Sequence, residues 1–170
     1  MKTLIEKFES KEPHYPNVYR NLVEKLSRKK EVSTSEGTDE EQFERGKSFG
    51  SYYECYMYAA IIGMRANNAL PFNRAEGTKF LKIESWKPKP LTQYIFMSLL
   101  ALADFEFEQI EDLTEEQAND KANELLYLLE SYAKGGFEII EKQVKDDPTY
   151  FENTLNTVGF LKNQDKRIAT

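Results

Sequence analysis

The sequence has very little of the side-chain chemistry that forms disulfide bonds or binds transition metals. It contains one cysteine, Cys55, and one histidine, His14, in 170 residues. A disulfide framework needs at least two cysteines, and a structural zinc site needs several cysteine or histidine ligands. The composition therefore excludes a disulfide scaffold and a metal centre of the Cys/His type. A single thiol is also in keeping with a reducing compartment.

Long apolar runs are missing as well. The longest one, residues 94–103, is broken by Ser98, whereas a transmembrane helix needs about 20 apolar residues. The first eleven residues lack the apolar stretch of roughly 7–15 residues that a secretory signal carries. These absences predict a soluble, cytoplasmic protein with no membrane partner.

The usual sequence motifs of catalysis do not occur either. There is no phosphate-binding loop, no dinucleotide-binding glycine motif and no nucleophile elbow. His14 lies between Pro13 and Tyr15 with no visible carboxylate partner, and Cys55 lies inside an apolar stretch where a thiol is usually inert. We therefore predict an ordinary surface or packing role for His14 and a packing role for Cys55, in a protein that is not an enzyme and uses no cofactor.

What the chain does have is enough apolar and aromatic material for a core. Apolar residues make up 40% of it, and it contains 11 Phe, 10 Tyr and one Trp. This content is typical of a folded chain, and the length suits one domain better than two. We expect a single domain over residues 1–170.

Helical spacing of apolar residues recurs along most of the chain and predicts an all-α fold of five to seven helices. Thr114 opens a T-E-E-Q capping box, which predicts the start of a helix. The segment 91–107 is apolar nearly all round and is expected to be the central helix. The other expected helices are residues 17–30, a segment entered from Asp39 that includes Tyr52–Met64, and residues 149–161.

Glycines interrupt two of these helical patterns. Gly63 inside an apolar helix suggests a close crossing with another helix, because glycine otherwise costs about 1 kcal/mol there. The pair Gly135-Gly136 leaves two alternatives open. Either two helices meet at the pair, or one helix runs through it.

Three segments lack a helical pattern. Residues 31–40 are rich in Ser, Thr and Gly and predict a mobile loop, and residues 163–170 predict a polar tail. Residues 77–90 include Lys-Pro-Lys-Pro, which disfavours a regular helix. We expect an irregular or extended connector there, pinned by Trp86, with a two-stranded element as a possibility.

Charge is unevenly distributed. The net charge is −6 overall, +3 over residues 1–103 and −9 over residues 104–170. Basic and aromatic residues alternate within residues 62–91, a pattern that can face a nucleic acid, an acidic protein partner or the acidic half of a second copy. An ordinary solvated connector is the remaining alternative. The candidate contact residues are Arg65, Arg74, Lys79, Lys82, Trp86, Lys87 and Lys89.

Two further hypotheses come from this charge pattern. Trp86, flanked by lysines and prolines, is either an anchor for a homodimer interface or a plug that fixes the connector to its own core. A carboxylate cluster near the end of the expected central helix could bind a divalent cation and support a hydrolase, although it lacks the histidines of common helical di-metal sites. The cluster consists of Asp104, Glu106, Glu108, Glu111 and Asp112.

Three stretches together resemble a known family. They are FGSYYECYMYAAIIGMRANNALPF at residues 49–72, LTQYIFMSLLALADFEFEQI at residues 91–110, and LLESYAKGGFEIIEKQV at residues 128–144. This combination resembles the small proteins associated with bacterial DNA phosphorothioation (Dnd) systems, over roughly residues 40–147. The resemblance implies an accessory role in DNA modification or phage defence, with protein partners from that system. It brings no catalytic motif with it.

Overall fold

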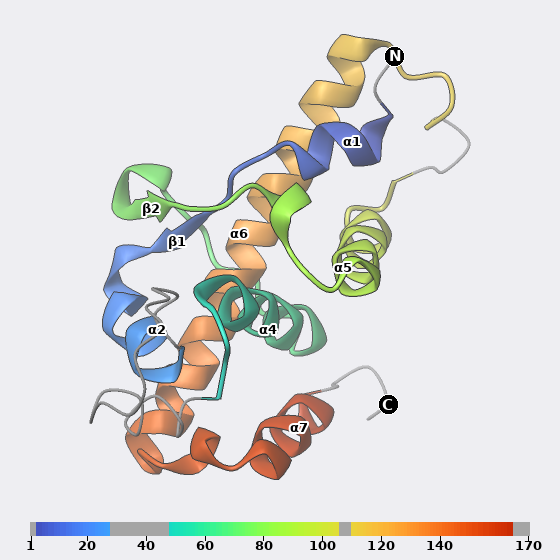
Figure 1. Ribbon diagram of the computed structural model, residues 1–170. Helices are drawn as coiled ribbons and strands as arrows, with labels where there is room; N and C mark the ends of the chain where they lie inside the picture. The colour runs from blue at the N-terminus through green and yellow to red at the C-terminus, as the bar shows by residue number, and fades with distance from the viewer. Residues whose placement is uncertain (1–2, 28–47, 106–109, 165–170) are drawn as a thin grey trace, which may run out of the picture.

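The computed structural model describes residues 3–27, 48–105 and 110–164, and within them the fold is mostly α-helical (Figure 1), as expected. Short 3-10 helices and a two-stranded sheet connect six α-helices of this part of the chain. The helices are α1 Leu4–Glu9, α2 Arg20–Leu26, α4 Tyr52–Arg65, α5 Lys89–Leu102, α6 Glu115–Asp146 and α7 Thr154–Asn163; the strands are β1 His14–Pro16 and β2 Gly77–Lys79.

Helix α6 is the axis of the molecule. It has 32 residues and begins at the expected capping box, in which Thr114 Oγ1 accepts from the Gln117 backbone N–H and Gln117 Oε1 accepts from the Thr114 N–H. Helices α1, α4 and α5 and strand β1 all pack against it, and Figure 1 shows it running the length of the view. Its apolar face supplies much of the core, including Leu125 and Leu129, which are fully buried.

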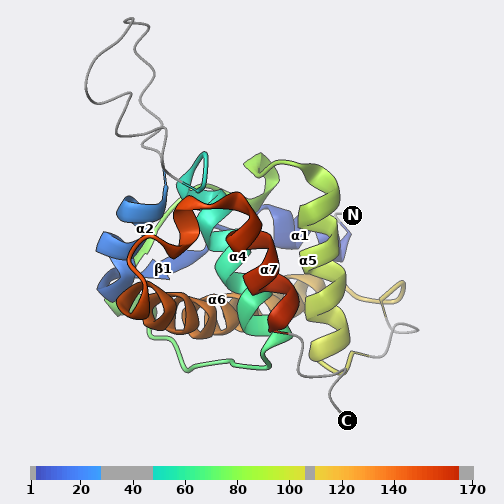
Figure 2. The same cartoon turned by 90° about the horizontal axis from the view of Figure 1, so that it is seen from below.

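The expectation that residues 91–107 form the central helix is wrong. Helix α5 ends at Leu102 and lies to one side, with α4 between it and α2 in both views (Figure 2). Tyr94 and Met97 on α5 are 50% and 51% exposed. An apolar surface nearly all round this helix therefore does not mean burial all round, because the described part of the chain packs against only part of the circumference of α5.

The glycines mark the crossing of α4 and α6. A Cβ atom on Gly63 would lie 2.8 Å from the carbonyl carbon of Tyr132, and one on Gly136 would lie 2.5 Å from the carbonyl carbon of Ala59. On Gly135 it would lie 2.8 Å from the carbonyl carbon of Asn68. The prediction of a close crossing at Gly63 is thus confirmed, and α6 runs through the glycine pair as one helix.

The connector after α4 forms half of a small sheet. Strand β2 pairs antiparallel with β1, which confirms the possible two-stranded element. The pairing joins segments more than 60 residues apart in the chain. The paired residues are His14 with Lys79, Tyr15 with Thr78, and Pro16 with Gly77.

Trp86 closes this connector onto the core. Its side chain is completely buried, its ring contacts those of Tyr53, Tyr56 and Phe80, and its Nε1 donates to the carbonyl oxygen of Leu81 at 3.3 Å. Trp86 is therefore a plug of the protein's own core. A side chain that is completely buried in its own core is not available to anchor a homodimer interface.

Helix boundaries near the N-terminus differ from the expected ones. The helix expected over residues 17–30 begins with a 3-10 turn, so Val18 is 74% exposed while Leu22 and Leu26 are buried. The helix expected from Asp39 is described only from Tyr52, after Ser51 as its N-cap. Residues 28–47, which include the predicted loop 31–40, lie outside the described residues.

The last helix is only partly the amphipathic one expected. Phe151 and Phe160 are buried as predicted, but Leu155 is 79% exposed and Val158 is 46% exposed. Most of the predicted polar tail lies outside the described part of the chain. Among the described helices, none combines the length and the apolar character required to cross a membrane.

Candidate functional site

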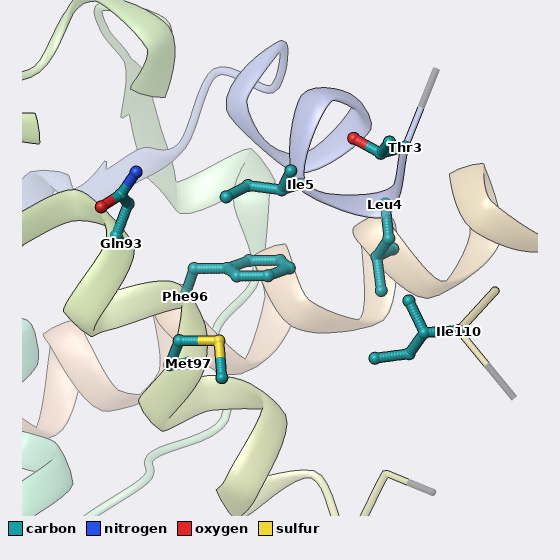
Figure 3. Close-up of a pocket in the computed structure, with 7 residues that line it drawn as sticks. All are labelled: Thr3, Leu4, Ile5, Gln93, Phe96, Met97 and Ile110. Atoms are coloured by element: carbon teal, nitrogen blue, oxygen red, sulfur yellow. The ribbon is translucent and has the colours of Figure 1, made fainter. Parts of the chain in front are cut away.

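An apolar pocket opens between α1, α5 and the turn that leads into α6 (Figure 3). Its volume is about 360 Å³, within the range of roughly 300–1,000 Å³ that is common for binding pockets. The lining residues are Thr3, Leu4, Ile5, Gln93, Phe96, Met97 and Ile110. Leu4, Phe96 and Ile110 point toward one common space, which therefore has an apolar wall from each element.

Local sequence signals fix the α1 side of this pocket. Helix α1 has only six residues and starts with a capping box, in which Thr3 Oγ1 accepts from the Glu6 N–H and the Glu6 carboxylate accepts from the Thr3 N–H at 2.7 Å. The ring of Phe8 packs on that of Phe96 at 5.3 Å between centroids. An ion pair between Lys7 Nζ and Glu115 Oε1 at 2.5 Å ties α1 to the start of α6.

The sequence did not predict this pocket. The available signal was the apolar surface of α5, which continues onto positions 94 and 97 on the exposed side. In the sequence alone, that surface predicts a helix at the centre of the core. The other wall comes from Leu4 and Ile5, about 90 residues away in the chain, and no local pattern joins the two segments.

The basic residues of the 62–91 segment are for the most part already paired. Lys79 Nζ lies 2.6 Å from Glu12 Oε2, and this hydrogen bond lowers the pKa of the Glu12 carboxyl. Lys82 Nζ lies 3.8 Å from Glu84 Oε1. The lysine charges on this surface are thus offset by neighbouring carboxylates, which weakens the attraction for phosphate groups.

The other members of the predicted contact set are dispersed. Lys79 and Lys82 line one shallow groove, but Arg74 turns toward α6 and Arg65 is half-buried at the end of α4. Lys89 Nζ donates to the Glu84 carbonyl at 2.6 Å and lies 3.5 Å from Glu9 Oε1. Lys87 is exposed, and Trp86 is buried.

Glu130 on α6 forms a buried polar cluster with His14 and Arg74. Its side chain is completely buried, and its Oε2 accepts from Arg74 Nε at 2.8 Å. Its Oε1 accepts from the His14 backbone N–H at 2.9 Å and lies 3.2 Å from His14 Nδ1. The cluster holds β1 and the turn before β2 against α6. No carboxylate partner of His14 is visible in the sequence because that partner lies 116 residues away.

The remaining sequence candidates have little reactivity in this structure. Cys55 is completely buried, and burial raises the pKa of its thiol to about 12, which agrees with the predicted packing role. Asp104, Glu111 and Asp112 are exposed, while Glu106 and Glu108 lie outside the described residues. Within residues 3–27, 48–105 and 110–164, no group of three or more His, Cys, Asp or Glu side chains could hold a metal ion.

Comparison with known proteins gives one match. No curated protein and no solved structure matches the chain. A family model described as DNA sulphur modification system-associated protein 4 matches residues 22–168, which is most of the chain and includes all three stretches that carried the resemblance. The predicted kinship with Dnd-associated proteins is confirmed: this chain belongs to the family of DNA sulphur modification system-associated protein 4.

Proposed function

We propose that this chain is a non-enzymatic accessory protein of a DNA sulphur modification system, and that it acts by binding another protein of that system through the pocket between α1 and α5. Phage defence is the process that such a system would serve. The observation that carries the proposal is the pocket itself, an apolar cavity of about 360 Å³ on the surface of a protein from this family.

The lining of the pocket supports binding more than chemistry. Among the described residues, Gln93 and Thr3 are the only polar ones that line the pocket, and the Thr3 hydroxyl is already used in the capping box. Met97 is half exposed at the pocket, where a partner would remove its apolar surface from water. Burying such surface is the main driving force of protein association.

The polar clusters elsewhere support the same proposal. The Glu130 carboxylate is fully engaged with Arg74 and His14, which ties two chain segments to α6. Lys79 and Lys82 would have to exchange their carboxylate partners for phosphates in order to bind nucleic acid. The nucleic-acid alternative is therefore less well supported than the protein-binding one.

The test is co-expression of the tagged chain with the proteins encoded next to it, followed by size-exclusion chromatography and affinity measurement. We expect a stable complex with one of the DNA sulphur modification proteins. Met97→Ala should weaken it roughly 10-fold, or about 1.4 kcal/mol, which is more than most interface residues contribute. Tyr127→Ala is the matched control, because Tyr127 is 48% exposed on α6 and does not line the pocket.

Two results would contradict the proposal. One is the absence of a complex with every encoded component of the modification system. The other is a complex that Met97→Ala and Tyr127→Ala affect equally, since the pocket would then have no special part in binding. Salt-sensitive binding of duplex DNA that is lost with Lys87→Ala would favour the nucleic-acid alternative instead.

A further inference from the structure

We infer that two copies of this chain pair through the exposed face of α5, with the two helices antiparallel and a two-fold axis close to Met97. The inference goes beyond the proposed function, because it concerns a homodimer of the chain alone. Its evidence is a helix face that is exposed but uncharged, together with charges of opposite sign at the two ends of that helix.

The exposed face of α5 carries uncharged side chains between Lys89 and Asp104. The exposed positions recur at helical spacing, so they lie on one side of the helix. They are Pro90, Gln93, Tyr94, Met97 and Ala101. Charged residues make up 31% of the sequence, and a helix face in contact with water normally has several of them. Covering Tyr94 and Met97, which are half exposed, would remove apolar surface from water.

The N-terminal end of this face has one positive charge in excess. Lys82 Nζ lies 3.8 Å from Glu84 Oε1. Lys89 Nζ lies 3.5 Å from Glu9 Oε1. Lys87 is exposed and has no ion pair among the described residues, so its charge remains available at this end of the helix.

The C-terminal end has a negative charge. Asp104 lies two positions beyond the last residue of α5, is exposed, and has no ion pair within the described ranges. Lys121 reaches this end, where its Nζ lies 4.5 Å from the centroid of the Phe105 ring, but its ion pair is with Glu124 at 2.6 Å. The sequence from 103 to 114 contains no Lys or Arg, so the neighbours of Asp104 along the chain do not neutralise it.

A two-fold axis close to Met97 makes this face complementary to itself. In an antiparallel pair, the start of each α5 lies beside the end of the other, so Lys87 of one copy faces Asp104 of the second. Nearer the axis, the large ring of Tyr94 meets the small side chain of Ala101 of the second copy, and Met97 meets its own counterpart. A closed two-fold dimer forms each unlike pair of contacts twice.

Other arrangements fit the face less well. A parallel pair of α5 helices would place Lys87 beside Lys87 and Asp104 beside Asp104, which is repulsive. A partner surface of one charge sign would be attracted at one end of the helix and repelled at the other. Contact between one helix and its copy is small, below about 1,200 Å² in total, so we expect a weak dimer with a Kd on the order of 10 µM.

The first test is the mass of the purified chain, measured by sedimentation from about 1 µM to about 200 µM. We expect it to rise from that of the monomer to that of the dimer. Met97→Lys brings two like charges together at the axis and should weaken the dimer at least about 10-fold. Tyr127→Lys is the matched control, because Tyr127 is 48% exposed on α6, and it should leave the dimer unchanged. Circular dichroism checks that each variant is folded.

Charge reversal tests the antiparallel direction. Lys87→Glu and Asp104→Lys each replace an attraction by a repulsion and should each weaken the dimer several-fold. The double variant restores opposite charges and should recover most of the affinity of the wild type.

A cysteine crosslink tests the position of the axis. Met97→Cys should form a disulfide with its own counterpart under mild oxidation, because a residue beside a two-fold axis meets itself. Tyr127→Cys is the control and should not crosslink. The native Cys55 is completely buried and therefore does not interfere.

Met97 also lines the pocket, so the homodimer and the partner complex would exclude each other, a consequence that rests on the proposed function. Added partner protein should therefore convert the dimer into a complex with one copy of this chain, and a complex that keeps two copies would contradict the exclusion.

Three results would overturn the inference. They are a chain that stays monomeric at about 200 µM, a dimer that Met97→Lys and Tyr127→Lys weaken equally, and a double charge variant that dimerises no better than either single variant. None of them bears on the proposed function, which is tested by the complex with another protein.

Discussion

Alanine at the crossing of α4 and α6 should separate the two helices and destabilise the fold. Gly136→Ala is the sharpest case, because its Cβ atom would lie 2.5 Å from the carbonyl carbon of Ala59 and closer still to the oxygen. Both obstructing atoms belong to the backbone of α4, so no side-chain rotation can make room. The helices must move apart, which loosens the packing of buried neighbours such as Ile62 and Phe137.

The size of the effect follows from the rigidity of the obstacle. Inserting one methyl group into a well-packed core costs about 1–3 kcal/mol, and an obstacle made of backbone belongs at the upper end. Total stabilities of domains are about 5–15 kcal/mol. A loss of about 3 kcal/mol in a chain of this length corresponds to a fall in Tm of roughly 6–12 °C.

The assay is thermal and urea unfolding followed by circular dichroism, with Gly159→Ala as the matched control. A Cβ atom on Gly159 meets nothing within 4 Å, and the residue lies inside α7. The same substitution there should stabilise the protein by about 0.5–1 kcal/mol through helix propensity. If Gly136→Ala melts within about 2 °C of the wild type, the helices do not cross as closely as described.

Three other perturbations have defined outcomes. Glu130→Ala should lower the free energy of unfolding in urea by about 3 kcal/mol, because it leaves Arg74 and the His14 N–H without their buried carboxylate. The control Glu141→Ala, which removes the exposed ion pair with Lys145, should lower it by about 0–1 kcal/mol, and equal losses would contradict a structural role for the buried cluster. Trp86→Ala should cost about 3–5 kcal/mol without changing the mass seen by light scattering, and a shift from dimer to monomer with intact stability would restore the interface alternative. Cys55 should resist thiol reagents at pH 8 until the protein unfolds, because burial raises the pKa of its thiol to about 12 from the ordinary 9.0, and rapid labelling of the native protein at pH 8 would contradict the burial. Since the thiol of the unfolded chain ionises at lower pH than the buried one, the contribution of this group to stability is complete below pH 9.0 and is lost as the pH rises toward 12.

Structural features that depend on residues within one or two helical turns of each other were predicted well. The capping box at Thr114 and Gln117 starts α6 because its two hydrogen bonds need only a separation of three residues. The unusual glycine at position 63 indicated a close crossing, since a glycine inside an apolar helix needs a reason. These features depend on local geometry, and local geometry is visible in a single sequence.

Structural features that depend on contacts between distant segments of the chain were not predicted. The partners of Lys79, Arg74 and His14 are separated from them by tens of residues, so their charges looked available when they were not. The apolar surface of α5 indicated a central helix, but only the packing of neighbouring elements decides which side of such a helix is covered. The candidate pocket was missed for the same reason, since one of its walls comes from residues 3–5 and the others from residues 93–110.

The sequence by itself determined that the chain is helical, where its longest helix begins, and which family it belongs to. These properties follow from the spacing of apolar residues, from the capping residues and from the stretches that resemble the family, all of which can be identified in the sequence alone. Only the tertiary structure decided that α6 is the axis, that Trp86 is core, that Glu130 neutralises Arg74, and that a pocket opens between α1 and α5. The physical reason is that burial and charge pairing are properties of surfaces brought together by folding, and one sequence does not state which of its surfaces will meet.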